Sequence, residues 1–101
     1  MQLHSIQEVT SKYMIDSVSN WKVTITATAQ RLSETSSSKK ILIIRASKNN
    51  SGDVYYGGSS ITTDNSDYLS PGEVRVLYFI DPYILYVLGT LSDKIYCVTF
   101  E

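Results

Sequence analysis

The side chains that could carry out chemistry in this chain are few and far apart. Its 101 residues contain one histidine, His4, and one cysteine, Cys97. Hydrolytic and metal chemistry require several converging ligands, or a nucleophile beside a base. A lone histidine cannot supply the ligand set of a metal enzyme. Apart from His4, the chain has no histidine that could activate Cys97 as a nucleophile. We therefore predict that His4 is an exposed polar residue and that Cys97 is a small buried hydrophobe.

Three aspartates, Asp53, Asp64 and Asp67, lie in segments that have the composition of turns. Paired carboxylates could bind calcium or act as the acid and base of glycoside hydrolysis. The alternative, which we favour, is that each caps backbone groups of its own turn. Gly57-Gly58 lacks the lysine and the following helix of a phosphate-binding loop, so it is interpreted as the end of a strand. The sequence therefore predicts no enzyme, no cofactor and no metal.

The composition indicates a single globular domain. Hydrophobic residues make up 43% of the chain, and its formal net charge is −1. Only Lys39 and Lys40 are adjacent among the basic residues, so the basic patch of a nucleic-acid-binding protein is missing. The apolar runs are far shorter than the roughly 20 residues of a transmembrane helix, and residues 1–20 do not have the pattern of a secretory signal. We predict a protein that binds neither nucleic acid nor membrane.

The elements that must position these side chains have the pattern of β-strands. Residues 21–29 alternate between apolar and polar types, and residues 41–44, 76–80 and 84–88 form apolar runs. Turn residues separate such segments at intervals of about 8–12 residues, as in a β-sandwich. We predict an all-β, single-domain antiparallel β-sandwich of jelly-roll type over residues 21–101, with seven to eight short strands. The expected core residues are Val23, Ile25, Ala27, Leu42, Ile44, Val54, Leu77, Leu85 and Val87.

Residues 1–20 have no clear period, and an arm that lies on a neighbour is favoured over a short helix or an irregular strand. Residues 49–58 are expected to form a hairpin, because Asn50 and Gly52 tolerate positive φ between two runs of β-type residues, 40–47 and 53–57. Gly57 and Gly58 would end the second run. A weaker strand is expected at residues 59–63.

Two further turns are predicted downstream. Pro71 and Gly72 suit the two central positions of a type II turn, and Gly89 would end a strand at residues 84–88.

Four of these segments, in their order along the chain, resemble a group of small structural proteins of tailed bacteriophages. They are Ala-Gln-Arg-Leu at 29–32, Asn-Ser-Gly-Asp-Val-Tyr-Tyr-Gly at 50–57, Leu-Ser-Pro-Gly-Glu at 69–73 and Leu-Tyr-Val-Leu-Gly at 85–89. Tyr56 and Arg75 depart from the pattern, and Arg75 occupies an expected inward position. The resemblance covers residues 21–101. It implies a non-enzymatic virion protein that assembles in the host cytoplasm: a capsid decoration or cement protein, or a tail or head-fibre component.

The apolar runs also predict an interaction surface, because strands that are apolar on successive residues show an apolar face outside the core. We expect a homo-oligomer, with a trimer as the favoured size, or docking on the major capsid protein or another virion protein. The alternatives are that residues 1–20 cover this face, or that exposed aromatic residues make the domain a carbohydrate-binding module. The expected interface residues are Tyr78, Ile80, Tyr83, Ile84, Tyr86 and Leu88.

Overall fold

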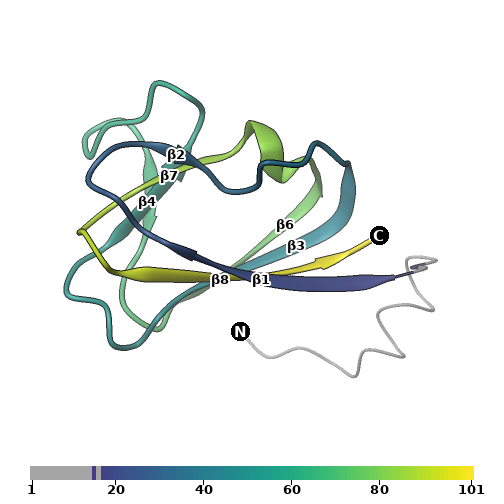
Figure 1. Cartoon of the computed structure of the whole chain (residues 1–101), viewed down its shortest axis with the longest axis horizontal. Coiled ribbons are helices and arrows are strands. Elements are labelled where there is room, and N and C mark those ends of the chain that lie inside the picture. Colours follow the sequence, from purple (N-terminus) through teal and green to yellow (C-terminus); the bar gives the residue numbers. More distant parts are fainter. Residues whose placement is uncertain (1–14, 16) are drawn as a thin grey trace.

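The computed structural model describes residue 15 and residues 17–101, which form two four-stranded sheets packed face to face (Figure 1). In spatial order, sheet A contains β1 (Val18–Thr24), β8 (Lys94–Phe100), β3 (Lys39–Ala46) and β6 (Val74–Ile80). Sheet B contains β2 (Gln30–Arg31), β7 (Tyr86–Leu88), β4 (Val54–Gly57) and β5 (Asp67–Leu69). Neighbouring strands are antiparallel. This strand order is that of an eight-stranded jelly roll, so the predicted β-sandwich is confirmed.

The core lies between the sheets because side chains alternate along each strand. Six of the nine predicted core residues are buried, and Val23 and Leu77 are half-buried against them. Ala27 is exposed, so its prediction was wrong. β1 ends at Thr24, and the next residues turn around Gln30, whose side-chain oxygen accepts a hydrogen bond from the Thr26 N–H at 2.8 Å. The local turn therefore interrupts the alternation.

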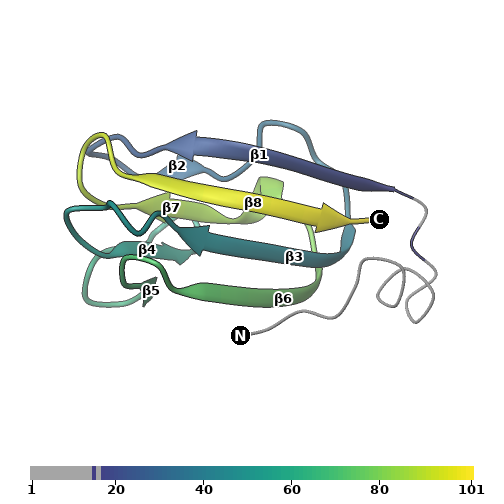
Figure 2. The same cartoon turned by 90° about the horizontal axis from the view of Figure 1, so that it is seen from below.

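The segment predicted as a hairpin joins the two sheets instead. β3 pairs with β6 and β8 in sheet A, whereas β4 pairs with β5 and β7 in sheet B. The connection between them is held against the β7–β8 turn, because the Asn50 side chain donates to the Lys94 carbonyl and accepts from the Lys94 N–H. These two bonds replace the pairing that a hairpin would have supplied. Figure 1 shows β3 and β4 in separate layers, and Figure 2 shows β3 between β8 and β6 in the sheet nearer the viewer.

Several element boundaries also differ from the prediction. β1 begins at Val18, inside the segment assigned to the N-terminal arm, because its residues pair in register with β8 from Val18↔Phe100 onward. Residues 59–63 form no strand; the Asn65 side chain accepts from the Thr62 N–H and donates to the Ser60 carbonyl in a loop. Residues 82–84 form a 3₁₀ helix, η1 (Pro82–Ile84), so the strand expected from residue 84 begins only at Tyr86.

The predicted turn at Pro71 and Gly72 is present. Gly72 has a φ of +87°, and the Glu73 N–H donates to the Ser70 carbonyl at 2.9 Å, as a type II turn requires. His4 and most of the predicted arm lie outside the described residues. Within the part of the chain that is described, no helix has the length and apolarity needed to cross a membrane.

Candidate interaction surface

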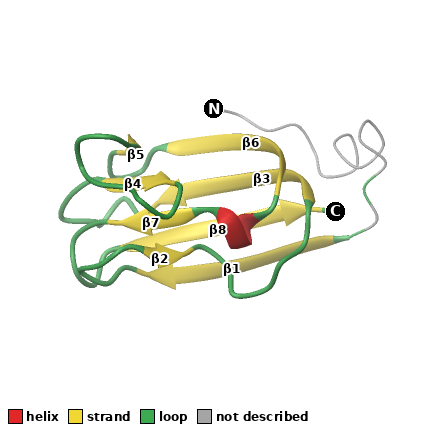
Figure 3. Cartoon of the chain, turned by 90° about the horizontal axis from the view of Figure 1, so that it is seen from above, coloured by secondary structure: helices red, strands yellow, loops and turns green. Residues whose placement is uncertain are grey.

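The outer face of sheet B carries a group of tyrosines around one arginine. Val87 is fully buried, so its neighbours Tyr86 and Leu88 point to the outside of the sheet. The strand register places Arg31 beside Tyr86 on that side, and Tyr55 between Leu88 and Tyr68. Figure 3 shows the strands that carry them, in the order β2, β7, β4 and β5 across the sheet. We call this surface the tyrosine face. It comprises Arg31, Tyr55, Tyr68, Tyr83, Tyr86 and Leu88.

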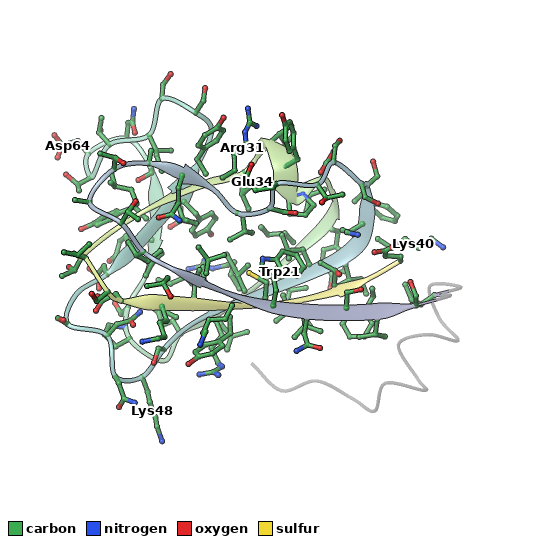
Figure 4. All side chains as sticks on the ribbon, in the orientation of Figure 1. Trp21, Arg31, Glu34, Lys40, Lys48 and Asp64 are labelled. Carbon is green, nitrogen blue, oxygen red and sulfur yellow. The ribbon has the colours of Figure 1, made fainter. Side chains whose placement is uncertain are left out.

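Arg31 is held in place by two aromatic rings. Its guanidinium carbon lies 3.9 Å from the centroid of the Tyr83 ring and 5.0 Å from that of Tyr86. Its Nη1 donates to the Tyr83 carbonyl at 2.7 Å, which fixes the orientation of the planar group. Figure 4 shows the side chain directed away from the sandwich. Within the described residues, Arg31 forms no ion pair, so its charge is available to a partner.

Tyr55 and Tyr68 extend the tyrosine face toward the edge of the sheet. Their ring centroids are 6.0 Å apart and the rings are inclined by 48°, a tilted arrangement that aromatic pairs favour. Tyr68 is 47% exposed. Tyrosine and arginine are enriched in the energetic centres of protein interfaces, because both bring a large contact area and a polar group.

The predicted interface residues are divided between several surfaces. Tyr86, Leu88 and Tyr83 lie on the tyrosine face, and the exposed Ile84 follows Tyr83 in η1. Tyr78 lies instead on the outer face of sheet A, opposite Ile41 in the register, and Ile80 packs against the core. The six residues therefore form no single patch, since β6 and β7 belong to different sheets.

Sequence reasoning missed three members of the tyrosine face, namely Arg31, Tyr55 and Tyr68. A signal for Tyr55 was present, because Val54 was an expected core residue and side chains alternate along a strand, so the next residue should point away from the core. Arg31 had no comparable signal, because Tyr83, its stacking partner, is 52 residues away in the sequence.

A second apolar cluster covers part of the outer face of sheet A. Ile41, Ile43 and Phe100 form its buried centre, and β3 is thus apolar on both faces, as expected. The half-buried Ile15 packs against this cluster, so one residue of the predicted arm contacts the outer face. Of the predicted covering segment, residues 1–14 and 16 lie outside the described residues, and β1 begins within residues 17–20. Val74, Val76 and Val98 complete the cluster.

A pocket of about 440 Å³ opens between the sheets where β5 and β6 form their edges. Its apolar wall contains Ile61, Leu77, Ile80 and Leu85, and Asp67 lies at its polar rim. The Tyr56 hydroxyl donates to Asp67 at 2.9 Å. Burial, and then this bond, raise the pKa of Tyr56 to about 12. Hydrogen bonds from the Tyr68 N–H and the Tyr56 hydroxyl hold the pKa of Asp67 below its usual range.

Arg75 closes the edge of the sandwich beside this pocket. It is opposite Ile44 in the register and so occupies the inward position that the sequence predicted. Its guanidinium donates to the Tyr68 carbonyl at 3.2 Å and lies 3.7 Å from the Asp67 carboxylate. An inward charge on an edge strand also makes that strand a poor template for further pairing.

Among the described residues, Cys97 and Asp67 have structural roles. Burial raises the pKa of the Cys97 thiol to about 12, so the thiol stays protonated near neutral pH. Asp67 accepts a hydrogen bond from the Tyr68 N–H, in keeping with a local cap, whereas Asp64 is exposed in its loop. No group of three histidine, cysteine or acidic side chains that could hold a metal ion is found in the described ranges.

No protein-family model matches the chain, and no curated protein or solved structure matches it either. The surfaces described above must therefore carry the functional interpretation.

Proposed function

We propose that this chain is a non-enzymatic structural protein of a tailed-phage particle, most specifically a capsid decoration protein. It docks on a neighbouring virion protein through the tyrosine face. The observation that carries the docking is the Arg31 guanidinium stacked on Tyr83, with Tyr86 beside it, on a face where it forms no ion pair with the described residues. The phage assignment itself depends on the ordered sequence motifs shared with tailed-phage structural proteins.

The residues of those motifs have architectural roles, which agrees with a protein that performs no catalysis. Asn50 ties the β3–β4 connection to Lys94, and Gly72 supplies the left-handed residue of a turn. Gly52 lies so close to Thr90 that an added Cβ would be 2.8 Å from its hydroxyl oxygen. Jelly rolls also occur in viral capsid proteins and lectins, and this analogy of fold supports the role.

The tyrosine face has the physical properties of a protein-binding surface. Stacking removes one side of the Arg31 guanidinium from water before any partner arrives, so little side-chain freedom remains to be lost on binding. The flanking rings of Tyr55, Tyr68 and Tyr86 add rigid contact area.

The first prediction concerns Tyr86. We expect Tyr86→Ala to weaken binding to particles that lack this protein by about 2 kcal/mol or more, since a central interface aromatic typically contributes that much. Cosedimentation of purified protein with such particles would measure the change.

Tyr96→Ala is the matched control. Tyr96 also contacts an arginine, with the Arg45 guanidinium carbon 4.6 Å from its ring centroid, but it lies on the outer face of sheet A. This control should bind as the parent does. If a folded Tyr86→Ala variant binds particles with the parent's affinity, the tyrosine face is not the docking surface.

A carbohydrate-binding module is the second candidate, and the same aromatic surface favours it, because sugar rings stack on exposed aromatic side chains. A glycan array probed with the parent and with Arg31→Gln would separate the two functions. Glycan binding that is lost in the variant, together with no affinity for particles, would replace the structural role with the carbohydrate-binding one.

A further inference from the structure

The strands of sheet B place a single charge on their outer face, that of Arg31. They contain one other charged residue, Asp67, which lies opposite the buried Tyr56 in the register and therefore points away from the outer face. The Asp67 carboxylate accepts a hydrogen bond from the Tyr56 hydroxyl. The other outward side chains of these strands are tyrosines and one leucine, so one positive charge is set in an uncharged, largely aromatic surface.

Two acidic residues have places near Arg31 in the fold, and neither forms an ion pair with it. Asp81 caps η1 and accepts hydrogen bonds from the Ser36 hydroxyl at 2.6 Å and the Tyr83 N–H at 2.9 Å. Glu34 follows Arg31 by three residues in the sequence and is exposed, and it forms no ion pair within the described part of the chain. The positive charge of Arg31 is therefore not neutralised by any residue that the structure describes.

The stacked guanidinium keeps its bidentate edge available. Its Nη1 donates to the Tyr83 carbonyl at 2.7 Å, whereas Nε and Nη2 make no hydrogen bond with the described residues and reach solvent. These two nitrogens lie on one edge of a planar group and match the spacing of the two oxygens of a carboxylate. The side chain is directed away from the sandwich, as Figure 4 shows, so a partner can approach it.

We propose that Arg31 binds a carboxylate on the protein to which the tyrosine face docks, supplied by an aspartate or glutamate side chain of that protein. Docking withdraws the guanidinium from water, and a charge that is buried without a counter-charge is strongly disfavoured. A carboxylate compensates this charge and fits the edge formed by Nε and Nη2. This assignment names the partner group for the proposed docking surface and rests on the proposed function.

A single carboxylate fits this face better than a polyanion does. Nucleic acids are bound through several cations that follow the row of phosphates. The other lysines and arginines that the structure describes lie in the strands of sheet A or in loops, so Arg31 is the one basic residue in the strands of sheet B. The tyrosines around Arg31 supply the uncharged contact area of a protein interface instead.

The first test compares two variants of the full chain, Arg31→Gln and the matched control Arg45→Gln. Arg45 also lies over a tyrosine ring, with its guanidinium carbon 4.6 Å from the centroid of Tyr96, but on the outer face of sheet A. Cosedimentation with particles that lack this protein would measure binding, and circular dichroism would check the fold. Arg31→Gln should bind at least about tenfold more weakly than the parent, whereas Arg45→Gln should bind as the parent does.

The second test uses the parent chain and so does not depend on the folding of a variant. Treatment of the particles with a water-soluble carbodiimide and glycinamide converts their accessible carboxylates to uncharged amides, and electron microscopy would check that the treated particles are intact. The parent should bind treated particles at least about tenfold more weakly than untreated ones. Arg31→Gln should bind both kinds of particle alike, because it lacks the group that pairs with the carboxylate.

Three results would overturn the carboxylate assignment. They are parent-like binding by a folded Arg31→Gln variant, an equal loss in Arg45→Gln, and an equal loss of affinity in the parent and Arg31→Gln on treated particles. Undiminished binding of the parent to treated particles would also overturn it, and would assign another anion, such as phosphate, if Arg31→Gln binds weakly.

The Tyr86→Ala variant separates this failure from failure of the proposed function. If Tyr86→Ala weakens binding while Arg31→Gln does not, the docking surface stands and only the carboxylate is wrong. If the parent binds no particle, or if Tyr86→Ala binds as the parent does, the proposed docking fails and the carboxylate assignment fails with it.

Discussion

Replacing Asp93 with alanine is expected to lower the free energy of unfolding by about 3 kcal/mol, because hydrogen bonds to a buried charged group are lost and their donors are left unpaired. The Asp93 side chain is buried and accepts from the Ser51 N–H at 2.9 Å, the Ser51 hydroxyl at 3.1 Å and the Gly52 N–H at 3.1 Å. It thereby fastens the β3–β4 connection to the β7–β8 turn. Urea unfolding followed by fluorescence would measure the loss.

Asp64→Ala is the control for this substitution. Asp64 is an exposed loop aspartate, and its replacement should change stability by less than about 0.5 kcal/mol. Equal effects of the two substitutions would show that the Asp93 bonds contribute nothing specific.

The same carboxylate predicts a pH dependence. Burial raises the pKa of Asp93, but the hydrogen bonds from Ser51 and Gly52 outweigh it and leave the pKa below its usual value. A carboxyl with a lower pKa in the folded state stabilises fully above its unfolded pKa of about 3.9, and this contribution is lost as the pH falls through the folded value. The parent should therefore lose more stability than Asp93→Ala below about pH 4. Thermal melting of both proteins at several pH values would measure this, and an equal loss of stability in the parent and in Asp93→Ala below about pH 4 would contradict it.

Ile44→Ala is expected to destabilise the fold by about 3–4 kcal/mol, through lost apolar burial and the cavity that remains. Ile44 is fully buried at the centre of β3, opposite Cys97 in β8 and Arg75 in β6. The neighbours of Ile44 belong to β6 and β8, which are both paired with β3, so these residues can move little into the cavity that the substitution leaves. Denaturant unfolding would give the difference.

Val18→Ala provides the comparison for the core substitution. Val18 is also a β-branched strand residue, but it is 41% exposed at the start of β1. Its replacement should cost less than about 1 kcal/mol, since little apolar surface is withdrawn from water there. A cost for Ile44→Ala as small as that for Val18→Ala would contradict the assigned core.

The sequence predicted only part of the tyrosine face. Tyr83, Tyr86 and Leu88 were expected at an interface from their composition and position, and the structure places them together on one side of sheet B. Tyr78 was predicted with them because β6 and β7 are both apolar along their length. The two strands lie in different sheets, so a shared composition did not mean a shared surface.

Local residue patterns alone determined the all-β class, the turn at Pro71 and Gly72, and the burial of residues such as Ile25, Leu42 and Val87. These features depend on a repeat of two residues and on backbone angles that single residue types favour, so they can be read within a few positions.

Only the tertiary structure decided which strands pair and which residues share a face. Alternation tells which side of a strand is buried but not which strand lies beside it. The connection that carries the chain from β3 in one sheet to β4 in the other is held by two bonds between Asn50 and Lys94, 44 residues apart. The stacking of Arg31 on Tyr83 likewise joins two short elements, β2 and η1, that are far apart in the sequence. Such contacts form only when the whole chain closes, because neither partner has a local pattern that requires the other.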